Sequence, residues 1–459
     1  MKMYYNVEDK PKFGQLIVFA IQQLLAIMAA TLVVPVIIGN GMSSAAALFG
    51  AGVGTLVYVL FTAKKSPVFL GSSFAFIGSM FAAFAGGVSM SLGYVGLILG
   101  AVFAGLVYVI IAIIVKFAGV GWINKLMPPV VIGPTVAIIG LSLAGNAVGD
   151  LQKGGVLDAE GNSVANVLLS VLVGIITLIV TMLCSTYGKK TAKLIPFILG
   201  ILAGYAVALV FTVIGNAADI EALKLIDFGK FTALVADGVT LKTFISVPDF
   251  TFLKAFGGVK ELNASYVGTI AVAYVPVAFV VFAEHIADHK NISSIIEKDL
   301  LEEPGLHRTL LGDGVGSMVG ALFGGCPNTT YGESVACVAI TRNASVATII
   351  AAAFGAIIVS FVNPFVAFVN SIPSCVMGGV CMALYGFIAV SGLKMVQKVD
   401  LNENKNLFVV SAILIAGIGG LSLTFGKITL TAVATSLILG IIVNLILSGK
   451  KEEVNETEE

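Results

Sequence analysis

Charged residues are scarce in this chain: Lys, Arg, Asp and Glu together make up 11% of its 459 residues, whereas 58% are hydrophobic. A protein surrounded by water could not cover its surface with this composition, and the mean hydropathy of +1.03 agrees. The scarcity of charge excludes a water-soluble fold and indicates a polytopic membrane protein. Because the 26 basic and 26 acidic residues balance, and no basic patch stands out, nucleic acid is not expected as a partner.

Cysteine is also rare. The five cysteines show neither CxxC spacing nor pairing with His, so they do not have the pattern of a metal site or a redox motif. We interpret them as small apolar residues and expect no metal and no other cofactor. They are Cys184, Cys326, Cys337, Cys375 and Cys381.

What the chain has in abundance is long hydrophobic segments. A membrane-spanning helix needs about 20 mainly apolar residues, and the sequence predicts fourteen such spans. The start of the chain is too polar and acidic for a signal peptide, so the first span is expected to be retained. The predicted spans are 13–38, 44–63, 66–86, 92–115, 129–148, 163–184, 194–214, 263–286, 309–325, 328–341, 344–369, 372–395, 406–424 and 429–448.

The basic residues are distributed unevenly between the two sides that fourteen spans define. Most of them fall on the side of the N-terminus, for example Lys64, Lys190 and Arg308, and most of the others lie in the long connection 215–262. Basic residues are enriched in cytoplasmic loops. We therefore expect both termini to be cytoplasmic in a plasma-membrane protein, with residues 450–459 as a short solvated tail.

Two short spans, 66–86 and 328–341, are interrupted by Gly and Pro and resemble each other. Gly71-Ser-Ser-Phe-Ala in the first matches Gly332-Glu-Ser-Val-Ala in the second. The two spans are seven apart, and an odd separation gives them opposite orientations. The match therefore predicts two seven-span halves of inverted topology, with the binding site where the interrupted spans meet.

A second match has the same offset of seven spans. Pro128 stands five residues before Gly133, and Pro373 stands five residues before Gly378. Each match is short, and Gly and Pro are common in membrane helices. Their shared offset supports the inverted repeat.

The segment Pro327-Asn-Thr-Thr-Tyr is predicted to be extended rather than helical. Such backbone is tolerated at membrane depth only where it is buried or lines a cavity. We expect it to lead into a half-helix that begins near Gly332, with a counterpart near Gly71. The first turns of these half-helices would offer free N–H groups to a ligand.

Two acidic residues lie in or beside apolar spans. Glu284 follows the apolar run 265–283, and Glu333 comes directly after Gly332. A charge inside a membrane is costly and is seldom kept for packing. Glu284 could instead face water at a helix end, and Glu333 could interact with a helix dipole. With half-helix N–H groups as donors and the two carboxylates as acceptors, the site would suit a small neutral ring with alternating C=O and N–H, such as a pyrimidine-dione.

Several motifs resemble the uracil permease branch of the nucleobase/ascorbate transporter family, also called the nucleobase:cation symporter-2 family. The most specific is Asn-Thr-Thr-Tyr-Gly-Glu at 328–333, because the purine branch usually carries Gln-Asn there. The resemblance covers almost the whole chain. The other motifs are Gln22 with Ala29-Ala-Thr-Leu-Val-Val-Pro35, Gly71-Ser-Ser-Phe-Ala-Phe, Ala283-Glu-His, Pro304-Gly-Leu-His-Arg, Ala339-Ile-Thr-Arg, Val376-Met-Gly-Gly and Leu384-Tyr-Gly-Phe-Ile.

The resemblance implies a secondary active transporter that imports uracil, or a related pyrimidine nucleobase, together with a proton. It implies an all-α fold of fourteen spans, with short extended stretches in spans three and ten, that works by alternating access and dimerises in the lipid membrane through its gate domain. Spans one to four and eight to eleven would form the core domain (13–125 and 263–369). The gate domain would comprise 126–214 and 370–449, with 215–262 as an extracellular connection.

The resemblance also implies roles for individual residues. Glu284 and Glu333 would hold the base, and the backbone at Phe74 and Gly332 would contact its carbonyl groups. Three further residues would frame the pocket or line it on the gate side: Ser73, Tyr331 and Tyr385.

The chain departs from the usual bacterial pattern at Asp288 and Gln23, where a His is frequent, at Ser334, where an Asn is frequent, and at Cys326. Asp288 lies four residues after Glu284 and would share its helix face. We expect Glu284, Asp288 and Glu333 to carry the coupling, with Glu284 protonated from outside as the base binds. Asp288 and His289 could equally be the start of a solvated loop. Asp313 and His307 are expected to be structural.

Other functions fit the sequence less well. A purine or xanthine permease of the same family remains open, as does coupling to Na⁺. An anion carrier of related fold would be expected to show a basic residue rather than two acids. A membrane enzyme would need a nucleophile, a metal cluster or paired acids, and Gly312-Asp-Gly only resembles the Gly-x-Gly-Asp of intramembrane aspartyl proteases. We therefore expect a transporter, not an enzyme.

Overall fold

The computed structural model describes residues 3–119, 122, 128–236, 238–425 and 428–448, so the predicted tail 450–459 lies outside the described residues. Within them, eight helical segments are long and apolar enough to cross a membrane. The fold is predominantly helical, as predicted. These segments are α1 (Phe13–Ile38), α2 (Ser44–Phe61), α4 (Met90–Ala118), α6 with α7 (Pro129–Ser142 and Ala144–Leu151), α8 (Val167–Tyr187), α10 (Pro196–Ala218), α14 (Ala264–Ile296) and α19 (Ser374–Val396).

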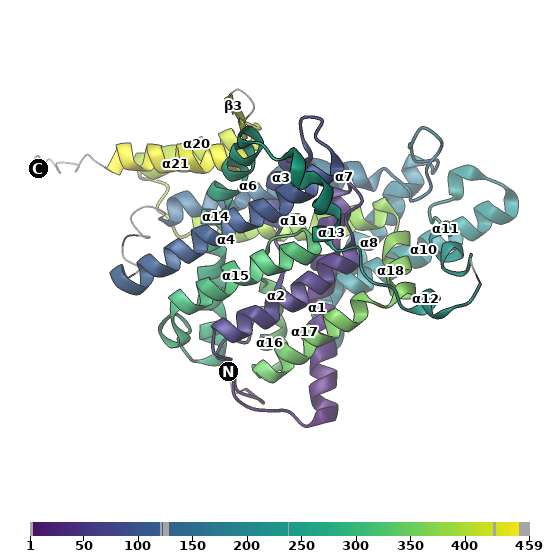
Figure 1. Ribbon diagram of the computed structural model, residues 1–459, viewed down its shortest axis with the longest axis horizontal. Coiled ribbons are helices and arrows are strands. Elements are labelled where there is room, and N and C mark those ends of the chain that lie inside the picture. The colour runs from purple at the N-terminus through teal and green to yellow at the C-terminus, as the bar shows by residue number, and fades with distance from the viewer. Residues whose placement is uncertain (1–2, 120–121, 123–127, 237, 426–427, 449–459) are drawn as a thin grey trace, which may run out of the picture.

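The remaining predicted spans correspond to shorter or less apolar helices. Each of the fourteen predicted ranges overlaps at least one helix, but the number of crossings remains a prediction. These helices are the 3₁₀ turn η1 (Phe74–Phe76) with α3 (Ile77–Phe84), α15 (Leu306–Gly324), α16 (Gly332–Thr341), α17 (Val346–Ser360), α18 (Asn363–Ser371), α20 (Asn404–Ile418) and α21 (Ala432–Ser448). Figure 1 shows α20 and α21 at one end of the molecule and α11 and α12 at the other.

Short elements fill the connections. The long connection 215–262 begins with the last turn of α10 and continues through η2 (Glu221–Leu223), α11 (Gly229–Thr232), η3 (Ala233–Val235), α12 (Leu241–Phe244), α13 (Thr251–Ala255) and η4 (Phe256–Glu261). Elsewhere lie α9 (Lys190–Leu194) and η5 (Leu301–Gly305). The strands β3 (Leu423–Phe425) and β4 (Ile428–Leu430) form an antiparallel pair. The prediction that residues 423–424 and 429–430 belong to membrane-spanning helices is therefore wrong.

Two short strands, β1 (Leu70–Ser72) and β2 (Asn328–Thr330), bring the two interrupted spans together. They pair antiparallel with Gly71 opposite Thr329, and the Ser73 N–H donates to the carbonyl of Pro327 at 2.8 Å. The pairing satisfies backbone groups that could not be left free at membrane depth. The predicted extended stretch and the half-helix beginning at Gly332 are therefore confirmed.

The position of the first half-helix was predicted less well. Gly71 lies inside β1, and the helical backbone begins three residues later, at Phe74. Phe74, rather than Gly71, thus holds the position that Gly332 holds after β2. The match between Gly71-Ser-Ser-Phe-Ala and Gly332-Glu-Ser-Val-Ala was out of register, because it aligned two glycines that have different tasks.

Glycines allow α2 and α15 to approach each other closely beside the two strands. A Cβ at Gly50 would meet the backbone of Gly320 and Gly324, and a Cβ at Gly316 would lie 2.7 Å from the carbonyl oxygen of Gly54. Small residues permit such backbone contact between membrane helices. The close approach also allows the Asn328 side chain of β2 to donate to the carbonyl of Gly50 at 3.1 Å.

Helix α14 extends ten residues beyond the predicted end of its span at 286. It begins at the N-cap Asn263, whose side chain accepts from the Tyr266 N–H, and continues to Ile296. Asp288 and His289 are therefore helical, and the His289 side chain is fully buried. The alternative of a solvated loop start at these residues is wrong.

The glycine contact between α2 and α15 gives a prediction about stability. Gly50→Ala should lower the melting temperature of the purified protein in detergent, because the new methyl group meets backbone atoms that cannot move aside. Overpacking typically costs about 1–3 kcal/mol, against about 1 kcal/mol gained in helix propensity. Gly386→Ala in α19 is the control, since no atom lies within 4 Å of the position that its new methyl group would take. Equal melting temperatures for the two variants would contradict the packing argument.

Candidate functional site

A cavity of about 470 Å³ lies beside the two paired strands. Its volume is in the range of small-molecule sites. One wall consists of residues from η1, α14, β2 and α16, and a second wall comes from α6, α10 and α19, including Val136, Phe197 and Leu384. Seven of the eight residues predicted for the site line it: Ser73, Phe74, Glu284, Asp288, Tyr331, Gly332 and Glu333.

The eighth predicted residue, Tyr385, does not line the cavity. It is buried behind Phe74, and the two rings meet edge to face with their centroids 6.1 Å apart. Its neighbour Leu384 lines the cavity instead. In this conformation Tyr385 supports the ring of Phe74 rather than facing the space beside it.

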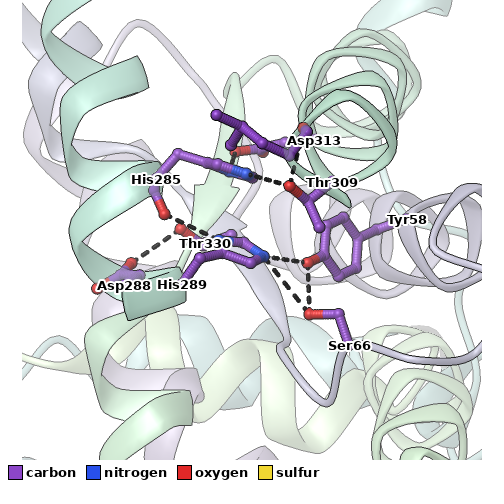
Figure 2. Close-up of polar contacts among 9 residues, drawn as sticks. Tyr58, Ser66, His285, Asp288, His289, Thr309, Asp313 and Thr330 are labelled. Atoms are coloured by element: carbon purple, nitrogen blue, oxygen red, sulfur yellow. Dashed lines mark hydrogen bonds and ion pairs between the residues drawn. The ribbon is translucent and has the colours of Figure 1, made fainter. Parts of the chain in front are cut away.

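Three acidic side chains face the cavity. Glu284 and Asp288 are four residues apart on α14 and therefore share one helix face. Glu333 lies in the first turn of α16. The Thr330 hydroxyl donates to Asp288 at 2.8 Å (Figure 2). In the described part of the chain, no Lys, Arg or His forms an ion pair with any of the three acids.

The glycine that follows Tyr331 leaves room beside the acids. A Cβ at Gly332 would come within 4 Å only of the Asp288 carboxylate, at 3.9 Å. The backbone at the start of α16 is therefore exposed to the cavity. A ligand can approach its N–H groups there, as expected of a helix N-terminus.

Tyr331 is held rigidly. Its hydroxyl donates to the carbonyl of Ser72 at 2.7 Å, and its ring occupies the space that any side chain at Gly71 would need. This contact explains why residue 71 is a glycine, because the ring of Tyr331 lies against the backbone of β1 at that position. Tyr331 thus joins β1 to the start of α16.

Two of the departures from the usual bacterial pattern contact each other. The Gln23 side chain of α1 donates to the hydroxyl of Ser334, and this oxygen also accepts from the Phe69 N–H at 2.9 Å. Gln23 and Ser334 are both buried. The pair ties α1 to the first turn of α16, one residue from Glu333.

Behind the acids, α14 has a second polar face with two buried histidines (Figure 2). His285 Nδ1 lies 2.7 Å from an oxygen of Asp313, and its Nε2 lies 3.0 Å from the hydroxyl of Thr309. His289 Nδ1 donates to the carbonyl of His285 at 2.8 Å, and its Nε2 lies 2.7 Å from the hydroxyl of Tyr58. The imidazole rings stack with their centroids 4.0 Å apart.

The hydrogen bonds restrict the protons on His285. The Thr309 hydroxyl donates to the carbonyl of Leu306 at 3.1 Å, so it accepts from His285 Nε2. One further proton must then lie between Nδ1 and Asp313, whichever of the two carries it. The pair has no net charge in either form, which suits complete burial.

These contacts fix the rotational orientation of α14 about its own axis. His285 and His289 are attached to α15 and α2, respectively, and this leaves Glu284 and Asp288 turned toward the cavity. This second face was not predicted, because the predicted span ends at residue 286 and leaves out His289. The spacing of His285 and His289, one residue after each acid, was the available signal.

Asp313 and His307 had been expected to be structural. Asp313 is fully buried and paired, which agrees with that interpretation, while His307 lies at a separate groove. The sequence analysis also missed Lys193 of α9, which lies along the cavity with Ser185 and Met395 and whose side chain is exposed. Among the described residues, no cluster of three His, Cys, Asp or Glu side chains could hold a metal ion.

Comparison with known proteins gives consistent matches over the chain. A family profile described as "Permease family" matches residues 14–426. The chain is 38% identical over 455 residues to the uracil permease of Bacillus caldolyticus, covering 98% of this chain and 96% of the relative. It is 36% identical to the uracil permease of Bacillus subtilis (100% and 98% covered) and 35% identical to that of Escherichia coli K12 (96% and 93%).

Solved structures with a similar fold are more distant in sequence. The transmembrane domain of the cyanobacterial bicarbonate transporter BicA superposes with a TM-score of 0.63 at 13% identity, covering 96% of this chain and all of that domain. The murine anion transporter Slc26a9 in its inward-facing state gives 0.62 at 11% identity, covering 96% of this chain and 69% of that chain. At these identities the likeness shows the fold alone.

The buried His285–Asp313 pair gives a prediction about ligand binding. Asp313→Asn keeps a partner for His285, because its amide N–H group donates to the unprotonated Nδ1 while Nε2 still donates to Thr309. The affinity for a ligand of the cavity should therefore stay within a few-fold of that of the wild type. Asp313→Leu leaves His285 Nδ1 unpaired, which typically costs about 1–3 kcal/mol. If part of this cost rotates α14, affinity should fall by about tenfold. Binding isotherms of the purified variants provide the measurement. Equal affinity of Asp313→Leu and the wild type would refute a positioning role for the pair.

Proposed function

Because the chain belongs to the nucleobase/ascorbate (nucleobase:cation symporter-2) permease family, we propose that this nucleobase permease imports uracil or a closely related pyrimidine. Its relatives at 35–38% identity over nearly their whole length are named uracil permeases. The observation that carries the proposal is the cavity itself. It combines acidic acceptors with an exposed helix N-terminus and an aromatic ring.

These groups complement the edges of uracil. The ring has two N–H donors and two carbonyl acceptors, and it carries no charge. Glu284 and Glu333 accept from the N–H groups, while the backbone N–H groups at the starts of η1 and α16, next to Phe74 and Gly332, donate to the carbonyls. Phe74 and Leu384 cover the faces of the ring, and Ser73 and Tyr331 frame the pocket.

The excess of acids in the cavity supports proton coupling as part of the proposal. Three carboxylates face one cavity in the membrane, and no described basic residue pairs with them. Moving such a site across the membrane with all three ionised is costly. We assign the transported proton to Glu284, which binds it together with the substrate, and we assign to Asp288 the exchange of this proton with Glu284 along one face of α14.

Transport by alternating access is supported by the two walls of the cavity. The first wall belongs to the proposed core domain, and α6, α10 and α19 belong to the proposed gate domain. Movement of one domain along the other would expose the site to each side in turn. The exposed Lys193 marks the open end of the cavity, and in the proposed orientation, with both termini in the cytoplasm, this end faces inward. The proposal includes a homodimer formed through the gate.

The inverted repeat has local support in the register of the strands. Leu70 pairs with Thr330 and Ser72 pairs with Asn328, so a local twofold axis that passes midway between Gly71 and Thr329 exchanges the two strands. A helix follows each strand after one residue. This is the relation that two halves of opposite orientation would produce. The fourteen spans and the extension of this symmetry to the whole chain remain part of the proposal.

Substrate specificity is tested by uptake of labelled uracil into proteoliposomes. Unlabelled uracil should compete fully, and xanthine and hypoxanthine should compete poorly. Glu333→Gln should weaken uracil binding by about 10–100-fold, because it removes a charge-assisted hydrogen bond of about 1.5–3 kcal/mol. The exposed Glu302→Gln is the control. Uptake of labelled xanthine without uptake of labelled uracil would assign the chain to purines instead.

Coupling is tested in the same proteoliposomes with imposed gradients. An inwardly directed proton gradient should drive accumulation, and uptake should decline as the external pH rises, because fewer protons are then available to bind with uracil. Glu284→Gln should abolish accumulation and the dependence on pH. Accumulation by this variant against a uracil gradient would contradict the role of Glu284. Accumulation driven by Na⁺ alone would contradict proton coupling while leaving the substrate unaffected.

A further inference from the structure

A second cavity of about 530 Å³ lies on the outside of the helix bundle and shares no residue with the candidate site. It is formed by the last turns of α2 and α4 and the first turn of α15. Its lining combines two kinds of side chain: the basic Lys116, His307 and Arg308, and apolar residues such as Phe61 and Phe117.

The basic residues have no acidic partner in the cavity. None of its lining residues is acidic, and within the described chain Lys116 and Arg308 take part in no ion pair. The acids nearest in sequence to Arg308 are Glu303 and Asp313, and Asp313 is buried against His285. Glu303 is occupied by Lys65, whose hydrogen bond lowers the pKa of that carboxyl. Lys116 and Arg308 repel each other across this hollow, and burial together with these two charges lowers the pKa of His307. An anion bound between them would relieve the repulsion.

An apolar stripe leads along α4 to these basic residues. Its side chains are exposed and recur every three or four residues, so they lie on one helix face. The stripe ends at Phe117, which is 81% exposed, beside Lys116. Its members are Leu106, Ile110, Ile113, Ile114 and Phe117.

This combination distinguishes a lipid from a free anion. A small phosphate would need only the basic groups. An acyl chain would cover the stripe on α4, while its headgroup lies at the end of the helix. The backbone at the start of α15 adds to the attraction, because its N-cap is Gly305, which offers no side-chain cap, and a helix N-terminus favours a negative charge.

We propose that this cavity binds an anionic phospholipid. Its phosphate lies between Lys116, Arg308 and His307, and one acyl chain follows the exposed face of α4. The lipid would join α4 to the start of α15, the helix that also carries Thr309 and Asp313. This proposal does not depend on which substrate the protein transports.

Binding of phosphatidylglycerol to the purified full-length protein tests the proposal. The protein is placed in nanodiscs of phosphatidylcholine alone or with added phosphatidylglycerol, and retained lipid is measured by native mass spectrometry. We expect the wild type to retain phosphatidylglycerol in preference to phosphatidylcholine. Neutralising one cation near a membrane weakens the binding of an anionic lipid by about fivefold. Lys116→Gln with Arg308→Gln should therefore weaken retention by about 25-fold.

The control is Lys394→Gln with Lys398→Gln, which removes two exposed cations at the end of α19 and should leave retention unchanged. Phe117→Ser removes the end of the apolar stripe and should weaken retention while leaving the cations in place. Equal retention by the wild type and the Lys116/Arg308 variant would overturn the proposal. Displacement of the lipid by inorganic phosphate as readily as by phosphatidylglycerol would also overturn it and would identify a simple anion site.

Discussion

The antiparallel pairing of β1 with β2 is the interaction on which the rest of the structure depends. Breaking two helices at membrane depth leaves backbone groups that water cannot satisfy, and six residues from distant parts of the chain satisfy one another there. Small residues make this possible. Gly71 accommodates the ring of Tyr331, and the glycines of α2 and α15 bring the helices close enough for Asn328 to hold β2.

The pairing also determines what the cavity can recognise. Each strand is followed by helical backbone, so the fold places two helix starts beside Glu333 of α16 and the acids of α14. Helix α14 contributes two polar faces. One carries Glu284 and Asp288 toward the cavity, and the other is attached through His285 and His289 to the helices behind. The fully buried hydrogen bonds of His285 and His289, which involve no net charge, thus fix the orientation of the helix that carries the two acids.

The sequence was informative where elementary physics leaves few choices. Scarce charge and repeated apolar runs predicted a helical membrane protein, and Pro327 to Tyr331 followed by Gly332 predicted a broken span. The high cost of placing a charged side chain in the membrane singled out Glu284 and Glu333. The other features depend on tertiary contacts between distant segments, which the sequence alone does not display. Nothing local shows that α14 continues to Ile296, since Asp288, His289 and Lys290 resemble a loop until Thr330 and Tyr58 are brought beside them. Similarly, the glycine at 71 serves the packing of Tyr331, and only the pairing of the strands reveals that Phe74 begins the helix.

We propose that one uracil ring binds between the acids of α14 and α16 and the ring of Phe74. An experimental structure of the protein with uracil, determined in lipid nanodiscs, is the decisive measurement. We expect the ring inside the cavity beside the paired strands, with its N–H groups toward Glu284 and Glu333 and a carbonyl group at the start of α16. A ring bound outside this cavity, or one inside it with both carboxylates out of hydrogen-bonding reach, would contradict it.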